Sequence, residues 1–496
     1  MTENKKVRVR FAPSPTGYLH IGGLRTALFN YLYAKHTGGD FLLRIEDTDR
    51  TRYVEGALEN LLEKLDWANI KIDEGVKLSS DGKVTEEGEF GPYIQSDRVK
   101  QGIYNKYIEK LLEEGKAYYC FCSQERLDNL RAQQKADGLM PKYDGLCRSI
   151  PYEEAKQRVA NGEAHTVRLK LPVNTDIEFE DKIKGKISFN TNDMDDQVLI
   201  KSDGFPTYHF AVVVDDHLMG ITHVVRGDEW ISSTPKHVYL YDALGWQRPE
   251  YIHLPTVLNK DHKKYSKRNG DGMVEDFMAE GYLPEGLINY LALLGWAPDS
   301  EDEIFTMDEL VDQFTFDRVS KTGAVFDVKK LQWVNGHYVR KMSVEDLAKA
   351  IKPYAIEAGF FDESYPMEKI QMLAETWQSA IDKFSDIKTL AKPYYIDDKD
   401  MEYTDEAKEA ITTDQAKTLF NQFIEELNTI DQVDEEFAKT VMKKVQKKTG
   451  IKGKNLWFPI RAALTGSVHG PELVNAFMIM GKDKMKERLE FVKENF

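Results

Sequence analysis

The chain has 496 residues, 41% of them hydrophobic and 30% charged, a composition typical of globular proteins that excludes wholesale disorder. At about 150 residues per domain, this length predicts roughly three domains. The 67 Lys and Arg against 83 Asp and Glu give a net charge of −16, which excludes a global basic field for DNA but leaves room for a local basic patch that binds RNA.

The first predicted elements form a strand, loop, helix and strand. Residues 7–12 alternate as in a strand, the breaker-rich PSPTG follows, and the apolar spacing from Leu24 to Leu32 predicts a helix. A second apolar strand is expected at 41–45. The two strands should be parallel, in a covered α/β sheet that binds a nucleotide. The Gly-rich acidic stretch 73–91 predicts a surface loop or a small hairpin.

The middle and the C-terminal parts of the chain differ in their pattern. Short alternating runs over 95–190 predict an inserted α+β region. Strands are then expected in VLIKSDG, YHFAVVVDD, THVVRGDEW and YIHLPTVLN, so the first domain is predicted to be interrupted. After about residue 275 the apolar period is helical, for example over 287–296 and 405–448, which predicts a helical C-terminal half.

The first segment with a chemical meaning runs from Pro13 to Gly23 (PSPTGYLHIGG). Its two prolines fix a turn, and Gly22 and Gly23 remove side chains that would keep a base or a phosphate off the helix start. His20 then faces the ligand that docks there. A buried histidine alone is more often structural, but this segment follows the end of the first strand, where open parallel sheets bind ligands.

A second segment, from Lys263 to Gly270 (KKYSKRNG), is a Lys-rich loop just beyond the strand-like HLPTVLN. Such a loop alone is usually a solvated surface. Combined with the glycine-rich turn, its ammonium groups can follow the charge of a triphosphate during displacement at the α-phosphate. They would then stabilise the transition state more than the ground state.

Three charged residues, Arg10, Glu46 and Arg226, close three of the predicted strands. A ligand with two carboxylates and one ammonium group needs two cationic donors and one anionic acceptor, and guanidinium groups suit paired contacts best. Because the strand ends meet at one sheet edge, we predict that the three side chains converge on such a ligand. The alternative is three surface ion pairs of little energy.

These segments together resemble the class I aminoacyl-tRNA synthetases, with the HIGH motif at His20 to Gly23 and the KMSKS motif at Lys264 to Arg268. Flanking sequences make the chain similar to the bacterial-type glutamyl-tRNA synthetases over about residues 7–340, and more faintly again at 458–473. These sequences are PSPTGYLHIGGLRTALFNYLYA, RIEDTDR, GPYIQSDR, DGFPTYHFAVVVDDHLMGITHVVRGDEW and RVSKTGAVFDVKKLQWVNGHYVR.

The resemblance implies a Rossmann-like, parallel-sheet catalytic domain that is split over residues 1–95 and 192–255. It also implies an inserted α+β acceptor-binding domain at 96–191, a stem-contact domain with the KMSKS-like loop at 256–330, and an α-helical anticodon-binding region at 331–496. The fold class is therefore predicted to be α/β with a helical C-terminal half.

The implied reaction is that of a glutamate–tRNA ligase. L-Glutamate and ATP would give glutamyl-adenylate and pyrophosphate, and the terminal ribose hydroxyl of tRNA(Glu) would then take the glutamyl group. No protein nucleophile is required, and Mg²⁺ would bind through the phosphates of ATP. The resemblance also implies a monomer, and it leaves open whether tRNA(Gln) is charged as well.

Individual residues are assigned by the same resemblance. The catalytic positions match His20, Lys264 and Lys267. The positions that contact ATP match Thr16, His20, Gly22, Gly23, Glu229, Leu258, Lys264 and Lys267. The positions that bind glutamate match Arg10, Ala12, Ser14, Glu46, Tyr208 and Arg226.

Three alternatives to this function are compatible with parts of the sequence. A glutaminyl-tRNA synthetase is disfavoured because Arg226 suits a second carboxylate better than an amide. A shorter relative that glutamylates a modified tRNA base would lack the helical C-terminal half. A catalytically silent RNA-binding paralogue is disfavoured by the intact His20, Lys264 and Lys267.

The three cysteines of the chain are Cys120, Cys122 and Cys147. Their spacing resembles a zinc site in some members of the family, but the position of the fourth ligand holds Ser149, a poor zinc ligand. Only Tyr143, a distant His165 or water could complete a tetrahedron. We therefore expect no structural zinc, and free thiols predict the reducing cytoplasm. The charged N-terminus and the absence of long apolar runs predict neither secretion nor membrane insertion.

Basic residues gather between positions 439 and 461 without any Asp or Glu. They are Lys439, Lys443, Lys444, Lys447, Lys448, Lys452, Lys454 and Arg461. Lysines four apart share a helix face, and Trp457 follows as a stacking platform, so we predict that Lys444, Lys448 and Trp457 contact tRNA. The alternative is a solvated helix with Trp457 in the core.

Overall fold

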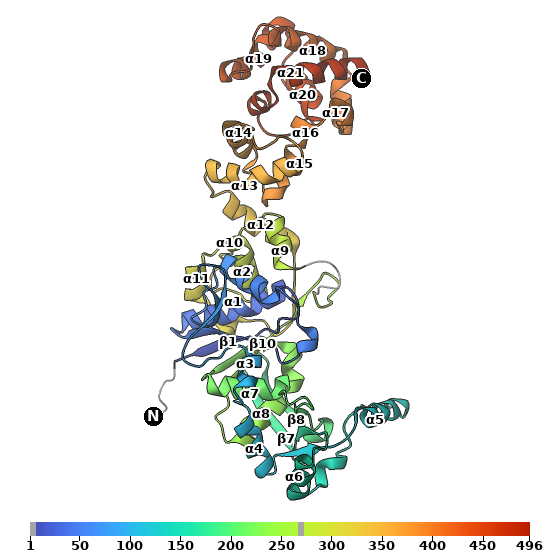
Figure 1. Cartoon of the computed structure of the whole chain (residues 1–496). Helices are drawn as coiled ribbons and strands as arrows, with labels where there is room; N and C mark the ends of the chain where they lie inside the picture. The colour runs from blue at the N-terminus through green and yellow to red at the C-terminus, as the bar shows by residue number, and fades with distance from the viewer. Residues whose placement is uncertain (1–5, 266–271) are drawn as a thin grey trace. The chain divides into compact units, whose positions relative to one another are not determined.

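The computed structural model describes residues 6–265 and 272–496, and the chain divides into two units (Figure 1). One unit comprises Met1–Phe277 with Leu287–Val328, and the other Met278–Gly286 with Lys329–Phe496. Within the described ranges, strands occur only in the first unit. Over the same ranges, no helix combines the length and the apolar character that crossing a membrane requires.

The first unit opens with the predicted strand, helix and strand. β1 (Arg8–Phe11) and β2 (Asp40–Leu43) pair in parallel, and α1 (Ile21–His36) connects them. A hairpin of β3 (Glu74–Leu78) and β4 (Val84–Glu87) extends this sheet, β3 parallel to β2 and β4 antiparallel to β3. The predicted parallel start and the predicted small hairpin are both confirmed.

A second sheet has the order β10 (His223–Gly227), β11 (Glu250–Leu254), β7 (Asp176–Asp181) and β8 (Gly185–Asn190). β10 lies beside β1, where the backbone N–H of Thr222 donates to the carbonyl of Arg8 over 2.9 Å. The carboxyl ends of β1, β2 and β10 therefore meet at one edge, which is where open parallel sheets bind ligands.

Residues 208–216, predicted as a strand, belong instead to the helix α7 (Tyr208–Leu218), so this prediction is wrong. The run Phe210–Val214 is buried on every side, and a short run without polar positions carries no period that distinguishes a helix from a strand. The adjacent Asp215 and Asp216 are both buried. In a strand, two adjacent side chains would face opposite sides of the sheet.

The remaining elements of the first unit surround these two sheets. A third, antiparallel sheet joins β5 (Ala117–Cys120), β6 (Thr166–Leu169) and β9 (Val198–Ile200), and β12 (Val257–Leu258) pairs with β13 (Ala324–Val325). The helices that lie wholly or partly in this unit are α2 (Ala57–Trp67), α3 (Gln95–Lys100), α4 (Asn105–Glu113), α5 (Gln124–Ala136), α6 (Tyr152–Ala160), α8 (Thr234–Leu244), α9 (Val274–Ala279), α10 (Pro284–Leu293) and α11 (Met307–Gln313).

The second unit is built from helices, as predicted for the C-terminal half. They are α12 (Val328–Val339), α13 (Val344–Glu357), α14 (Met367–Trp377), α15 (Ile387–Leu390), α16 (Lys392–Tyr395), α17 (Asp405–Ile411), α18 (Asp414–Leu427), α19 (Glu435–Thr449), α20 (Lys454–Thr465) and α21 (Leu473–Asn495). α21 is kinked at Gly481. Apolar faces of α18, α19, α20 and α21 share one buried core, which stabilises helices whose outer faces are polar.

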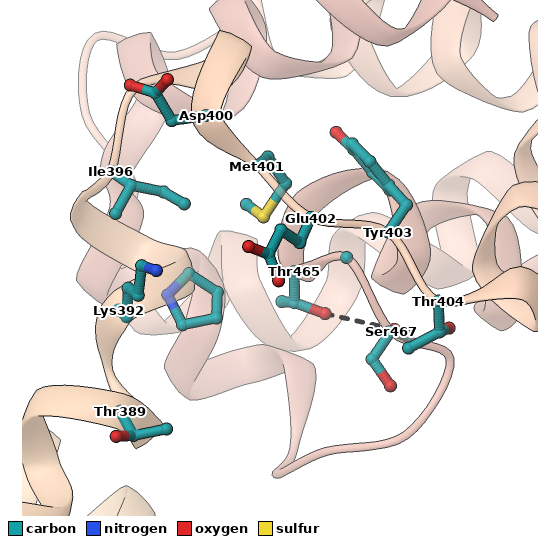
Figure 2. A pocket seen from close by; sticks show the side chains of 12 residues that line it. Thr389, Lys392, Ile396, Asp400, Met401, Glu402, Tyr403, Thr404, Thr465 and Ser467 are labelled. Carbon is teal, nitrogen blue, oxygen red and sulfur yellow. Dashed lines mark hydrogen bonds between the residues drawn. The ribbon is translucent and has the colours of Figure 1, made fainter.

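The second unit also carries an open pocket of about 420 Å³ beside α16 and the end of α20 (Figure 2). The chain turns sharply there at Gly466, whose φ of +74° and close approach to the carbonyl of Glu402 leave no room for a side chain. The hydroxyl of Thr465 donates to the carbonyl of Ser467 over 3.2 Å and fixes this turn (Figure 2).

Candidate active site

A cavity of about 990 Å³ opens at the sheet edge where β1, β2 and β10 end. It brings together nearly all residues that the sequence assigned to ATP and glutamate. The predicted residues that line it are Arg10, Ala12, Ser14, Thr16, His20, Gly22, Gly23, Glu46, Tyr208, Arg226, Glu229 and Lys264. Leu258 is not among the described residues that line the cavity, and Lys267 lies outside the described residues.

His20 is the N-cap residue of α1, and contacts with residues on either side of the KMSKS-like loop fix this helix start. Its Nδ1 accepts the backbone N–H of Gly22 over 3.1 Å, which caps the helix. The N–H of Ile21 donates to the carbonyl of Gly272 over 2.9 Å, and the rings of His20 and Tyr265 lie 5.8 Å apart. The two sequence motifs, far apart in the chain, therefore flank the same cavity.

Lys264 reaches the cavity as an exposed side chain. Its Nζ lies 3.6 Å from Oε1 of Glu229, with 61% and 50% of the two side chains exposed. An exposed pair of this kind contributes at most about 1 kcal/mol. Lys264 can therefore exchange Glu229 for a phosphate at a small cost in free energy.

Arg10 is buried, and a carboxylate already neutralises its charge. Its Nε and Nη2 donate to the two carboxylate oxygens of Asp216 over 2.9 and 3.2 Å. Burial alone would raise the pKa of Asp216, but Arg10 and Arg44 outweigh it and hold that pKa below its usual value. Only Nη1 stays off the carboxylate, with a long contact of 3.5 Å to the carbonyl of Val225. Arg10, predicted to bind the ligand, is thus already paired with Asp216 in the cavity wall.

Asp216 belongs to a buried network of six charges beneath the cavity. Arg44 donates to Glu46 over 2.9 Å and lies 2.8 Å from Asp216. Arg98 donates to Asp215 over 2.7 Å. The three cations are Arg10, Arg44 and Arg98, and the three anions are Glu46, Asp215 and Asp216, so the formal charges sum to zero. Sequence reasoning missed this network, although the pair of acids after the apolar VVV was a signal for it.

Glu46 is a buried carboxyl group that lines the cavity. Burial raises the pKa of its carboxyl group, and Arg44 and Arg10 oppose this shift only in part. The group lines the cavity and is 4% exposed. Because a buried carboxylate is stabilised by a second cation, Glu46 is suited to accept the ammonium group of a ligand.

Arg226 differs from Arg10 because its hydrogen-bond partners are uncharged. It is 6% exposed, and among the described residues no carboxylate lies within 4.0 Å of its nitrogens. It donates to the hydroxyl of Tyr208 over 3.3 Å and to that of Thr234 over 2.8 Å, and it contacts His237 and His253 at 3.2 Å each. A buried cation without a carboxylate favours an anionic ligand.

The comparisons with known proteins agree with this geometry. The family model of the class I tRNA synthetases for E and Q, catalytic domain, matches residues 6–333, and that of an anticodon binding domain matches residues 346–493. A glutamate–tRNA ligase from Finegoldia magna is 61% identical over 484 residues, 98% of each chain. The chain belongs to the glutamate–tRNA ligases. The predicted family, fold class, activity and enzyme class are confirmed.

Two further relatives of this ligase cover nearly its whole length. A glutamate–tRNA ligase from Alkaliphilus metalliredigens is 50% identical over 497 residues, 99% of each chain. The crystal structure of a glutamate tRNA ligase from Elizabethkingia meningosepticum, described as in complex with its amino acid, superposes with a TM-score of 0.85. It is 36% identical and covers 99% of this chain and 100% of its own. As a member of the aminoacyl-tRNA synthetases, the ligase uses ATP as a substrate.

The three cysteines of the ligase converge around Tyr143. Sγ of Cys122 lies 3.7 Å from Sγ of Cys147, and the Tyr143 hydroxyl lies 3.4 Å from Sγ of Cys120 and 3.6 Å from Sγ of Cys122. Tetrahedral zinc with sulfur and oxygen ligands gives distances between ligands of about 3.5 to 3.8 Å. These three distances agree with such a site. Of the groups that the sequence offered in place of Ser149, Tyr143 is the one that the structure brings within contact distance of two thiols.

The predicted RNA-binding lysines of the ligase lie on α19 and at the start of α20. Lys444 and Lys448 are exposed, and Trp457 is 43% exposed rather than in the core. Lys448 forms an ion pair with Glu426 at 2.7 Å. Among the described residues, Lys444 has no carboxylate within 4.0 Å, so its charge is available to a phosphate.

Gly272 offers a test of the contact between the two motifs. A Cβ atom there would lie 2.5 Å from Nε2 of His20 and 2.6 Å from the ring of Tyr265, and φ is +104°. We expect Gly272→Ala to lower the rate of ATP–pyrophosphate exchange, with glutamate and tRNA present, by about 10-fold or more, because small displacements of a positioning group are costly. The matched control is Gly82→Ala, which has a positive φ but no atom within 4 Å. Equal rates in both variants would contradict the expected role of this contact.

Proposed function

We propose that the cavity joins L-glutamate to ATP and then passes the glutamyl group to tRNA(Glu). The observation that carries this proposal is the buried Arg226, whose charge no carboxylate of the described chain neutralises, in the same cavity as Glu46 and His20. A diacid with an ammonium group complements such a site in charge.

On the glutamate side, Arg226 and the hydroxyl of Tyr208 would receive the side-chain carboxylate. Glu46 would accept the α-ammonium group. Arg10 would offer its Nη1, and the stretch from Ala12 to Ser14 would close the site around the ligand. These assignments rest on the lining of the cavity and on the charge of each group.

On the ATP side, the phosphates would lie at the start of α1. Six cavity residues are assigned to ATP: Thr16, His20, Gly22, Gly23, Glu229 and Lys264. A Cβ atom at Gly22 would meet only Nδ1 of His20, at 3.5 Å, so the helix start is open to an anion. Leu258, which pairs with Lys264 in a backbone bridge, and Lys267 complete the proposed set. Mg²⁺ would enter with the phosphates.

The chemistry consists of two displacements without a protein nucleophile. The α-carboxylate of glutamate attacks the α-phosphorus of ATP, the bond to the β-phosphate oxygen breaks, and pyrophosphate leaves. A ribose hydroxyl at the tRNA end then attacks the glutamyl carbonyl, loses its proton and displaces AMP. The residues of the cavity align the reacting groups, and His20, Lys264 and Lys267 would stabilise charge on the phosphate oxygens.

The other parts of the chain are assigned by the same proposal. Residues 96–191 would bind the acceptor end of tRNA, 256–330 its stem and 331–496 its anticodon. The catalytic domain would comprise 1–95 and 192–255. We propose that the ligase works as a monomer in the cytoplasm, and parallel charging of tRNA(Glu) and tRNA(Gln) will decide whether it accepts both.

The role of Arg226 can be tested by removing its charge. We expect Arg226→Gln to raise the KM for glutamate about 100-fold or more, since truncating one partner of a buried charge pair costs several kcal/mol. The KM for ATP should stay within about twofold, because the proposed phosphate site is separate. The control is Arg131→Gln on the exposed α5. An unchanged KM for glutamate would exclude Arg226 from glutamate binding.

The tRNA surface can be tested at Lys444. We expect Lys444→Glu to raise the KM for tRNA several-fold and to reduce the slope of log affinity against log salt by about 1, as loss of one phosphate contact predicts. The KM for ATP should not change. The control is Lys408→Glu on α17, an exposed lysine of the same unit. Unchanged tRNA kinetics would remove this surface from the proposal.

We also propose that Cys120, Cys122, Cys147 and Tyr143 hold a structural zinc ion. The site would tie β5 to the segment around Cys147 and would take no part in the reaction. The three distances between these donors support this assignment.

The zinc proposal is tested by metal analysis of the purified protein. We expect about one zinc ion per chain, as for a closed structural site, and its loss in Cys122→Ser. Tyr143→Phe should bind zinc more weakly, because an oxygen ligand is lost. Ser149→Ala is the control and should retain the metal. A metal-free wild-type chain, after expression with added zinc, would refute the proposal.

A further inference from the structure

The buried guanidinium of Arg226 is held in place by two histidines. Arg226 on β10 stands opposite His253 on β11 in the parallel register, and its Nε lies 3.2 Å from Nε2 of that ring. Its Nη1 lies 3.2 Å from Nδ1 of His237 on α8. Since a guanidinium group only donates hydrogen bonds, both ring nitrogens that face it must be acceptors.

The tautomer of His253 is set from its far side. Oδ2 of Asp181 lies 2.7 Å from ring Nδ1 and accepts the backbone N–H of His253 over 3.0 Å. Burial would raise the pKa of Asp181, but its contacts with His253 and with backbone N–H groups lower it, so the carboxyl group is ionised and accepts. The ring hydrogen is therefore on Nδ1, and the lone pair of Nε2 points at Arg226.

The tautomer of His237 is set in the same manner. Its Nδ1 accepts from Arg226, so its hydrogen is on Nε2, which lies 2.9 Å from Nδ1 of His209. Burial, together with the charge of Arg226, lowers the pKa of His237 well below its usual value, and burial lowers the pKa of His209 to about 4. Both rings are thus neutral near pH 7. Nδ1 of His209 accepts from His237, and Nδ1 of His237 accepts from Arg226.

The hydrogen bonds of Arg226 can be counted. A guanidinium group has five N–H donors. One goes to His253, one each to Tyr208 and His237 from Nη1, and one to Thr234 from Nη2. One N–H of Nη2 remains, on a residue that lines the cavity. The side chain is therefore fixed by four neutral acceptors, and its full charge is retained.

The contrast with Arg10 shows what these neutral acceptors achieve. Arg10 lines the same cavity, yet Asp216 both fixes it and neutralises it. A carboxylate beside Arg226 would fix that side chain equally well. It would also cancel the positive charge by which the site distinguishes a carboxylate ligand from an amide. That charge is needed because the two groups have a similar shape and both offer an oxygen acceptor.

We propose that His237 and His253 are positioning residues that select a carboxylate over an amide, by holding Arg226 through neutral acceptors that leave its charge to the substrate. This inference rests on the proposed contact of Arg226 with the glutamate side chain. Asp181, through His253, and His209, through His237, fix the tautomers on which it depends.

The test compares substitutions that keep the acceptor with substitutions that remove it. His237→Asn places an amide oxygen near the position of Nδ1, and His253→Gln places one near that of Nε2. His237→Leu and His253→Leu remove the acceptors. His237→Asp adds a carboxylate beside Arg226. For each variant, the KM and kcat for glutamate, the KM for ATP and the activation of glutamine would be measured by pyrophosphate exchange in the presence of tRNA.

The expected results distinguish a role of the two histidines in positioning Arg226 from a role in folding alone. The Leu variants should raise the KM for glutamate about 10- to 100-fold, as loss of a hydrogen bond to a charged group predicts, while the KM for ATP stays within about twofold. The Asn and Gln variants should recover most of this loss. His237→Asp should reduce the preference for glutamate over glutamine about 10-fold or more, because it neutralises the selecting charge.

Other outcomes would overturn the inference. If the acceptor-keeping and acceptor-removing variants have equal glutamate kinetics, or if the KM values for glutamate and ATP rise together, the histidines act only in folding. An unchanged preference in His237→Asp, with the thermal transition of the wild type, would also refute it. If Arg226→Gln binds glutamate normally, the proposed contact of Arg226 with glutamate is wrong. If Arg226→Gln loses glutamate binding but the histidine variants do not, only the positioning role of the histidines is wrong.

Discussion

The cavity depends on a buried set of six charges that sum to zero. Three arginines and three carboxylates connect the ends of β1 and β2 to α3 and α7: Arg10, Arg44, Arg98, Glu46, Asp215 and Asp216. Each of them alone would be costly to bury, and removing one partner of such a pair is strongly destabilising. The strands and α7 must therefore come together for any member to be satisfied. This constraint fixes the sheet edge on which the ligand-facing residues stand before a substrate arrives.

The two buried arginines Arg10 and Arg226 at this sheet edge differ in whether a carboxylate neutralises them. The network neutralises Arg10 completely, whereas Arg226 is bound by hydroxyl groups and neutral imidazole rings. The protein thus retains the buried positive charge of Arg226 in this cavity. Because uncompensated burial disfavours an ion, this charge is stabilised when an anion occupies the site.

Much of this site could be predicted from the sequence, because its residues stand in turns rich in Pro and Gly or directly at the ends of predicted strands. Turn residues around His20 and polar residues after short strands indicate a sheet edge without knowledge of the fold. The remainder could not be predicted for two physical reasons. The run before Asp215 and Asp216 is apolar on all sides and carries no period, so α7 was predicted as a strand. His237 acts on Arg226, which belongs to another element, and a lone histidine has no spacing signal in the sequence.

The cations of the site also differ in how firmly they are held, and this difference matches the two kinds of ligand charge. Arg226 is buried and bound on four sides, which suits a carboxylate that keeps its charge through both chemical steps. Lys264 is exposed and pairs only loosely with Glu229. A weakly held ammonium group loses little when it moves, so it can follow the negative charge that passes to pyrophosphate as the α-phosphorus is attacked. A rigid cation therefore serves recognition, and a movable one serves the transition state.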